Sequence, residues 1–332
     1  MQPVAWGEIV LALALAAVSP AGATPGWLPP HDVTTTPGVV TSPSVATDAW
    51  GSAFAVWAGD QAVLSAARPA AAGAWESPAT LSGPGGTAPR IAVTPAGTAI
   101  AVWLLSGLVQ AAVRPPGAAW GPAETISSPL DSSQSPQISV DAAGDAFAVW
   151  GRARGEEKSI QASIRPVETG FWGPPEDVTI PPASDYQPKL AVSARGDAIV
   201  VWTLPGGSLR SSFRSADTQA WEPPQTISEG GDITSSGYAS VGLDGEGNAV
   251  VVCERREGFN AGVVGSRRPI STGEWEVWTP IGGGSNQISQ GGPTHRWPRI
   301  ALDAAGNAIV VWQRTTQPPP PPPALVLDGG LE

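Results

Sequence analysis

Acidic side chains are the first candidates for chemistry in this sequence. Residues 244–248, Asp-Gly-Glu-Gly-Asn, place three oxygen-bearing side chains at alternate positions, as the start of a calcium-binding loop does. Such a loop needs a glutamate at its twelfth position, where this chain has Arg255. We therefore predict a plain turn here, and we expect no metal and no cofactor.

Other catalytic groups are sparse. The only histidines are His31 and His295, and neither a zinc-ligand spacing nor a Gly-x-Ser-x-Gly nucleophile motif occurs. Two carboxylates could still cleave a glycosidic bond, because the fold sets their separation. We predict no catalytic residue, and we keep a polysaccharide hydrolase or lyase as an alternative. The acids available for that role are Glu156, Glu157, Asp185, Asp232, Glu254 and Glu257.

Composition limits the partners of the chain. The formal net charge of −11 over 332 residues argues against nucleic acid or an anionic membrane surface as ligand, since both require a cationic face. The single cysteine, Cys253, excludes a disulfide framework within the chain, so packing must stabilise the fold. Glycine and proline recur at fixed positions between short apolar runs, which is typical of an all-β protein.

Six segments of the chain align without gaps, and this repetition determines the predicted fold. Each has the pattern of a β-hairpin, with an alternating strand, an Asp-x-x-Gly type of turn and a second strand. The glycine of each turn is expected to supply a positive φ, and an aspartate at the start of the turn can cap it. The segments are PSVATDAWGSAFAVW (43–57), PRIAVTPAGTAIAVW (89–103), PQISVDAAGDAFAVW (136–150), PKLAVSARGDAIVVW (188–202), ASVGLDGEGNAVVVC (239–253) and PRIALDAAGNAIVVW (298–312).

Two further strands fit into each repeat. A third strand such as VLSAARP, which ends at Pro69, is followed by a turn, a tryptophan and a short fourth strand such as PATLS. Four antiparallel strands in about fifty residues make the blade of a β-propeller. We predict an all-β, six-bladed propeller of four-stranded antiparallel blades. The tryptophans after the third strands are Trp75, Trp120, Trp172, Trp221 and Trp275.

The chain ends are predicted to close the ring. The segment around Trp27 matches the fourth-strand pattern yet precedes the first hairpin, whereas the sixth hairpin has no such strand after it. An N-terminal strand would therefore complete the last blade, with residues 324–327 or the N-terminal apolar run as its third strand. An open or truncated array is the alternative.

Three regions follow from this reading. Residues 1–23 are predicted to be a signal peptide, because the apolar run 9–18 precedes the small residues Ala21-Gly22-Ala23. The segment before that run contains Glu8 and no basic residue, so the alternative assigns the run to a strand. Residues 24–316 form the propeller, and 317–332 form a Pro-rich segment and a C-terminal tail or outer strand. We expect a secreted monomer with no transmembrane segment in the mature chain.

The recurring Val-Asp-x-x-Gly-Asn-Ala, Val-Trp and later Gly-Trp-x-x-Pro pattern resembles bacterial extracellular β-propeller repeat proteins, most of them uncharacterised. The resemblance covers residues 27–312. The hairpin turn also resembles the NHL repeat, although that family continues with Val-Ala-Asp where this chain has Val-Trp, and it differs from the sialidase Asp-box. The resemblance implies an architecture and an extracellular location, and it implies no activity.

Residues that the copies share are interpreted as structural. The tryptophans are expected to pack between blades, and Cys253, which replaces one of them, is expected to be buried in a strand. Recurring arginines in the third strands could suggest an anion clamp, but equivalent positions around a ring cannot converge on one ligand. We predict that they are solvated or paired with carboxylates. They are Arg68, Arg114, Arg165, Arg214 and Arg268.

The loops after the second and fourth strands differ between copies, and they lie on one face, opposite the tight hairpins. Aromatic and charged loop residues on a rigid scaffold are typical of binding sites, although solvent-exposed loops that have merely diverged would look the same. We predict a secreted or surface-attached binding or scaffold protein that recognises a glycan or a protein, with a purely structural surface array as a further alternative. The predicted ligand-binding residues are Arg154, Tyr186, Tyr238, Arg255, His295 and Trp297.

Overall fold

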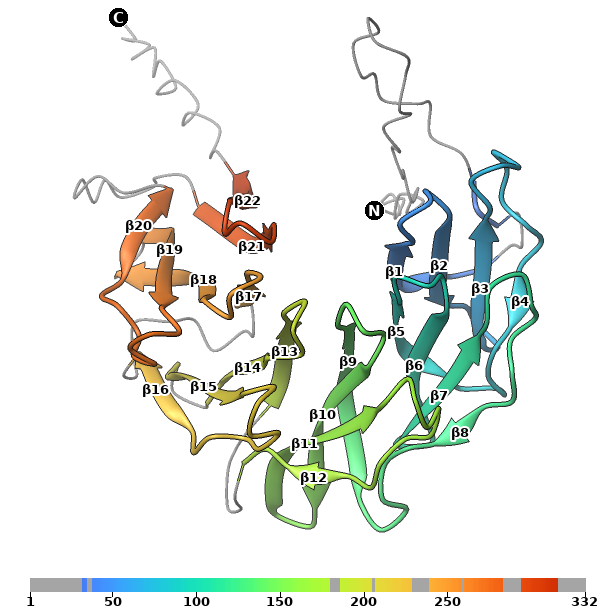
Figure 1. The fold of residues 1–332 in the computed structure, drawn as a ribbon, viewed down its shortest axis with the longest axis horizontal. Coiled ribbons are helices and arrows are strands. Elements are labelled where there is room, and N and C mark those ends of the chain that lie inside the picture. Colours follow the sequence, from blue (N-terminus) through green and yellow to red (C-terminus); the bar gives the residue numbers. More distant parts are fainter. Residues whose placement is uncertain are drawn as a thin grey trace, which may run out of the picture.

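A computed structural model describes residues 32–34, 38–179, 186–204, 207–228, 239–257, 260–282 and 294–315, and every regular element in these ranges is a β-strand. The strands form six antiparallel sheets, which follow one another around an arc in chain order (Figure 1). The predicted signal peptide, the closing strand around Trp27 and the tail 317–332 lie outside the described residues.

Three four-stranded sheets make up the N-terminal half of the arc. The first holds β1 (Thr41–Thr47), β2 (Ala53–Ala58), β3 (Val63–Arg68) and β4 (Ala79–Thr80). The second holds β5 (Thr87–Val93), β6 (Ala99–Leu105), β7 (Leu108–Arg114) and β8 (Glu124–Thr125). The third holds β9 (Ser132–Val140), β10 (Ala146–Arg154), β11 (Glu157–Arg165) and β12 (Glu176–Asp177).

The C-terminal half repeats this plan, and its last sheet has two strands in the described residues. The fourth sheet holds β13 (Tyr186–Val192), β14 (Ala198–Thr203), β15 (Leu209–Arg214) and β16 (Gln225–Ser228). The fifth holds β17 (Ser240–Leu243), β18 (Ala249–Glu257), β19 (Asn260–Arg268) and β20 (Thr279–Gly282). The sixth holds β21 (Thr294–Leu302) and β22 (Ala308–Thr315).

The first strand of every sheet lies on the inner side of the arc. Contacts link β1 to β5, β5 to β9, β9 to β13, β13 to β17 and β17 to β21. The short fourth strands β4, β8, β12, β16 and β20 lie on the outer side (Figure 1). The predicted four-stranded unit is thus confirmed in five sheets, and the first strands lie nearest the middle of the arc.

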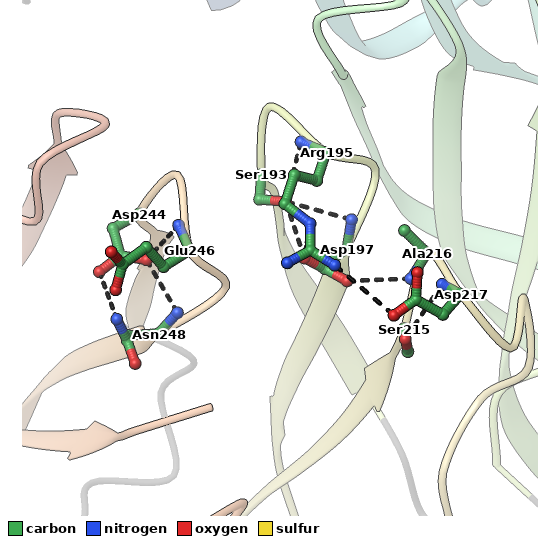
Figure 2. Close-up of polar contacts among 9 residues, drawn as sticks. All are labelled: Ser193, Arg195, Asp197, Ser215, Ala216, Asp217, Asp244, Glu246 and Asn248. Carbon is green, nitrogen blue, oxygen red and sulfur yellow. Dashed lines mark hydrogen bonds and ion pairs between the residues drawn. The ribbon is translucent and has the colours of Figure 1, made fainter. Parts of the chain in front are cut away.

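The hairpin turns have the predicted chemistry. The Asp244 carboxylate accepts hydrogen bonds from the backbone N–H groups of Glu246 and Asn248, both at 2.9 Å, and from the Asn248 side chain at 2.7 Å. In the fourth sheet Ser193 takes the aspartate's place, and its Oγ donates to Asp197 at 3.2 Å; Figure 2 shows both versions. The predicted caps Asp48, Asp141 and Asp303 make equivalent backbone bonds.

The glycine of each turn has both a conformational and a packing role. All six have positive φ, between 82° and 99°, as predicted. A Cβ on Gly247 would lie 3.0 Å from the Asp197 carboxylate of the preceding sheet, and one on Gly196 would lie 3.0 Å from the Asp141 carboxylate. Successive turns therefore stack closely, because a side chain at these positions would separate them.

The last residue of the turn connects it to the second tight turn of the same sheet. The Asp197 carboxylate accepts a hydrogen bond from the N–H of Ala216 at 2.9 Å (Figure 2), and Asn248 accepts one from Ile270 at 2.9 Å. The turns after the first and third strands therefore lie together at one end of each sheet. The loops after the second and fourth strands lie, as far as the structure describes them, at the other end of each sheet, as the sequence predicts.

Tryptophans of the second strands connect neighbouring sheets. Trp103, Trp150 and Trp202 are almost completely buried, and each packs against apolar residues of the sheet before it. Cys253 takes this place in the fifth sheet, where burial raises the pKa of its thiol to about 12. The predicted structural roles of the tryptophans and the cysteine are confirmed at these positions.

Third-strand arginines connect the sheets further out. The Arg268 guanidinium lies 4.4 Å from the centroid of the Phe213 ring and 2.9 Å from the Glu222 carboxylate, both in the fourth sheet. Arg114 pairs with Glu76 of the first sheet at 2.9 Å. The predicted carboxylate pairing is confirmed for these two arginines, which stack and pair with the preceding sheet.

We predict that Gly247→Ala is more destabilising than Gly73→Ala. Both glycines have positive φ, where alanine costs roughly 1–2 kcal/mol, but only Gly247 is packed against another turn. Urea unfolding should show a loss of about 1 kcal/mol for Gly73→Ala and a loss at least twice as large for Gly247→Ala. Equal losses would mean that the turns do not stack closely.

Candidate functional site

In the residues that the structure describes, a β-bulge interrupts five first strands at the residue before the repeated proline. The pairing register shifts at this point in β1, β5, β9, β13 and β21. The residue at the bulge has a positive φ although it is not glycine, which is an infrequent and strained conformation. These residues are Ser42, Ala88, Ser135, Gln187 and Trp297, with φ between 50° and 55°.

The residue after the proline occupies the same register in five sheets, and Ser240, which follows Ala239 rather than a proline, occupies that register in the fifth sheet. Each of these residues pairs with the valine of its second strand, as Arg90 does with Val102 and Lys189 with Val201. The first strands line the inner side of the arc, so the six positions follow one another along that side. We call this set the axial ring; it consists of Ser44, Arg90, Gln137, Lys189, Ser240 and Arg299.

Ring side chains bond to backbone groups of the first strands. Ser44 Oγ accepts a hydrogen bond from the N–H of Ile91 in the next sheet, at 3.3 Å. Arg90 and Gln137 each donate to the carbonyl oxygen of the proline before them, at 2.8 Å, and Arg299 does so at 3.0 Å. The long side chains therefore turn toward the bulge and stay on the first strand.

The three cations of the ring act on one another. Burial and then the charges of Arg299 and Arg90 lower the pKa of Lys189 to about 8. Burial and then the charge of Arg299 lower the pKa of Arg90. These residues belong to the second, fourth and sixth sheets, so the arc brings cations from distant parts of the chain to one place. A like charge destabilises the charged form of its neighbour, so this arrangement reduces stability.

Arg154, a predicted ligand-binding residue, is part of a local ion-pair cluster. Its Nε lies 2.6 Å from one oxygen of Asp131, while Arg152 Nε lies 2.9 Å from the other. Burial alone would raise the pKa of Asp131, but hydrogen bonds and charges from the two arginines lower it overall. Arg154 thus anchors the segment before β9 to the β10–β11 hairpin.

The other predicted residues are only partly described. Tyr186 is the first residue of β13, three positions before Lys189, and Trp297 lies in β21 two positions before Arg299. Trp297 is 43% exposed. Arg255 lies half-buried in β18, and His295 pairs through its backbone with Arg314. Tyr238 and the side chains of Tyr186 and His295 lie outside the described residues.

The structure places Tyr186 and Trp297 on the strands that carry two of the ring cations. Sequence reasoning missed the ring itself, because its members lie inside the aligned hairpins and were grouped with the structural repeat. Two features of the sequence could have pointed to the ring. A proline recurs within a strand, where proline is confined to edges and bulges, and the residue after it changes from serine to arginine, glutamine and lysine.

The acidic residues that could support glycosidic chemistry are also spread out. Glu156 and Glu157 lie exposed at the β10–β11 turn, and Glu254 is buried in β18. Asp185, Asp232 and the side chain of Glu257 lie outside the described residues. The described part of the chain has no group of three or more His, Cys, Asp or Glu side chains placed to hold a metal ion, and none of its segments is a helix that could span a membrane.

No protein-family model matches the sequence, and no curated protein matches it either. Solved structures do match the fold. An ulvan lyase, a polysaccharide lyase solved bound to -[GlcA(1-4)Rha3S]-, has a TM-score of 0.54 at 12% identity, over 84% of this chain and 82% of that one. The intramolecular trans-sialidase from Ruminococcus gnavus has a TM-score of 0.52 at 7% identity, over 84% and 90%.

Hydrazine synthase from Kuenenia stuttgartiensis matches equally well, with a TM-score of 0.54 at 13% identity, over 83% of this chain and 75% of that one. The sialidase and lyase matches are β-propellers. At these identities the matches show a common fold and no common activity.

We predict that Lys189→Gln stabilises the protein at neutral pH. The pKa of Lys189 is about 8 in the folded protein against 10.5 for an ordinary lysine, so the folded state disfavours its proton. That cost is complete below pH 8 and disappears by pH 10.5, so wild-type stability should rise over this interval. Unfolding at pH 7 should show Lys189→Gln more stable by about 1–3 kcal/mol.

The difference in unfolding free energy between Lys189→Gln and the wild type should shrink as the pH approaches 10.5. Lys158→Gln, which removes the only other lysine, is the control and should show no such gain. If Lys189→Gln were no more stable than the wild type at pH 7, neither burial nor the neighbouring cations would disfavour the charged form of Lys189.

Proposed function

We propose that this chain is an extracellular, non-enzymatic binding protein, a six-bladed β-propeller that takes a saccharide at its axial ring. The observation that carries the proposal is the ring itself. Six residues share one register, yet their side chains differ in size, charge and hydrogen-bonding capacity. A position needed only for folding would hold similar residues in every sheet, as the valines opposite the ring do.

The bulges support the same proposal. A bulge re-aims side chains and ends regular pairing, and strained backbone clusters at ligand sites. Here five bulges stand next to the ring, at the ends of the first strands that lead into the variable loops. The ring, the bulges and the predicted loop residues Tyr186 and Trp297 thus belong to one region of the molecule.

Trp297 is the bulge residue best suited to a sugar. At the other four described bulges the residue is serine, alanine or glutamine, whereas the sixth sheet places a large aromatic side chain in the same strained conformation and leaves much of it exposed. An aromatic face is the usual surface for the apolar face of a sugar ring, while polar neighbours bind its hydroxyl groups. A saccharide is also the kind of ligand named for the ulvan lyase that shares this fold.

We predict that Trp297→Ser weakens saccharide binding roughly tenfold, about 1.4 kcal/mol, without unfolding the protein. Serine already occupies the equivalent bulge in the first and third sheets, at Ser42 and Ser135, so the backbone accepts it. Binding is measured on a glycan array and then by calorimetry with the best ligand. Phe171→Ala, which removes an exposed aromatic ring on the outer side, is the control. Unchanged affinity for Trp297→Ser, or no glycan bound by the wild type, would contradict the proposal.

Closure of the six blades into a ring is the second part of the proposal. In the five complete sheets, the second-strand valine equivalent to Val311 is buried, whereas Val311 is 59% exposed. The sheet that would follow it in a ring is the first, whose Trp57 packs instead with Val33 and Val40 from the residues before β1. The pKa of Arg90 also supports closure: after burial, the charge of Arg299 lowers it, so the sixth sheet lies near enough to the second for their charges to interact.

We predict that Val311→Asp is strongly destabilising. If the ring closes, the carboxylate is buried against the first sheet and costs several kcal/mol, as it would at the buried Val201. Val277→Asp, at a fully solvated position, should change stability by no more than about 0.5 kcal/mol. Thermal and urea unfolding of Val311→Asp, Val201→Asp and Val277→Asp measures the loss of stability in each variant. A Val311→Asp variant as stable as Val277→Asp would indicate an open arc.

A further inference from the structure

We infer that Arg90, Lys189 and Arg299 form an anion-binding triad, and that the ligand of this protein is an acidic saccharide whose carboxylate or sulfate group lies between them. The inference rests on the proposed saccharide function and names the class of saccharide. We call these three residues the cationic triad.

The triad occupies alternate sheets. Arg90 lies in the second, Lys189 in the fourth and Arg299 in the sixth, and each is paired with the valine at the same position of its second strand. The intervening ring positions hold the uncharged Ser44, Gln137 and Ser240. Because the first strands contact one another in sequence along the inner side of the arc, the three positions are spread along that side. An anion in the middle of the arc can therefore approach all three positions.

The triad differs from every other arginine group described above. Arg114 and Arg268 pair with glutamates, and Arg152 and Arg154 share Asp131. Among ion pairs between described residues, none involves Arg90, Lys189 or Arg299. The hydrogen bonds described for the two arginines go to proline carbonyl oxygens, which are neutral. Three positive charges thus face one another with no carboxylate among the described ion pairs to balance them.

This arrangement is unexpected in so acidic a chain. Asp and Glu number 29 against 18 Lys and Arg, so carboxylates were abundant enough to pair with the triad. Burial, and then the charges of Arg299 and Arg90, lower the pKa of Lys189, as expected if the three groups lie near one another. Groups that reduce stability in the absence of a ligand are typical of binding sites, because an anion between them removes the repulsion. Carboxylate and sulfate oxygens are the acceptors that guanidinium and ammonium groups bind most strongly.

The test uses the full chain and an oligosaccharide that contains glucuronate and sulfated rhamnose, together with its desulfated and carboxyl-reduced forms. The variants are Arg90→Gln, Lys189→Gln and Arg299→Gln. Glutamine is chosen because Gln137 occupies the equivalent position in the third sheet and makes the same bond to its proline carbonyl. Arg68→Gln is the matched control: it removes the same charge from a third strand, where Arg68 donates to Gly73 O.

Calorimetry should show at least a tenfold loss of affinity for each triad variant and less than a twofold change for Arg68→Gln. The triad variants should melt at the same temperature as the wild type or higher, so that lost binding is not lost folding. The desulfated and carboxyl-reduced forms identify which anion the triad binds. The form that lacks this group should bind the wild type more weakly than the intact oligosaccharide does. It should bind the triad variants no more weakly than it binds the wild type.

Three outcomes separate the triad from the proposed function. Tight binding of neutral saccharides that the triad variants do not affect would overturn the triad and leave the proposed function intact. If saccharides fail to bind but inorganic sulfate raises the melting temperature of the wild type and not of Arg90→Gln, the anion site stands and the saccharide ligand is overturned. A wild type that binds neither saccharide nor sulfate overturns both.

Discussion

Packing of each sheet against the next is the interaction on which the rest of this structure depends. The chain has one cysteine and so no internal disulfide, and the fourth strands are too short to hold a sheet alone. Neighbouring sheets are connected at up to three levels instead: stacked turns at one end, a second-strand tryptophan or Cys253 in the middle, and in some sheets a third-strand arginine further out. The axial ring takes one residue from each of six sheets, so this packing alone determines how its members lie relative to one another.

Arginine has different roles at different distances from the axis. On the third strands it lies over a phenylalanine ring and pairs with a glutamate of the preceding sheet, where charge and stacking act together. Near the β10–β11 hairpin, two arginines hold one buried aspartate. On the first strands, Arg90 and Arg299 turn toward proline carbonyls and repel Lys189. The same residue type thus stabilises the sheets on the outside and reduces stability at the axis, which is the contrast expected between scaffold and site.

The fold alone does not distinguish among activities. A lyase, a sialidase and a hydrazine synthase all share it at 7–13% identity. What is specific to this chain is the content of six positions that every sheet presents in the same register. A repeated scaffold makes such variation easy to recognise, because any position that changes in chemistry while the backbone stays the same is not required by the repeat.

The sequence by itself determined the repeated unit: the hairpin turns, their glycines and aspartate caps, the buried tryptophans and the end of each sheet that carries the variable loops. These features depend on residues close together in the chain, and the repeat shows each of them several times. Tertiary structure alone decided that Arg154 forms an ion pair with Asp131, because neither the turn pattern nor the repeat relates residues 131 and 154. It also decided that Arg90, Lys189 and Arg299 act on one another. They are about a hundred residues apart in sequence, and only the curvature of the arc, set by packing between sheets, brings their charges together.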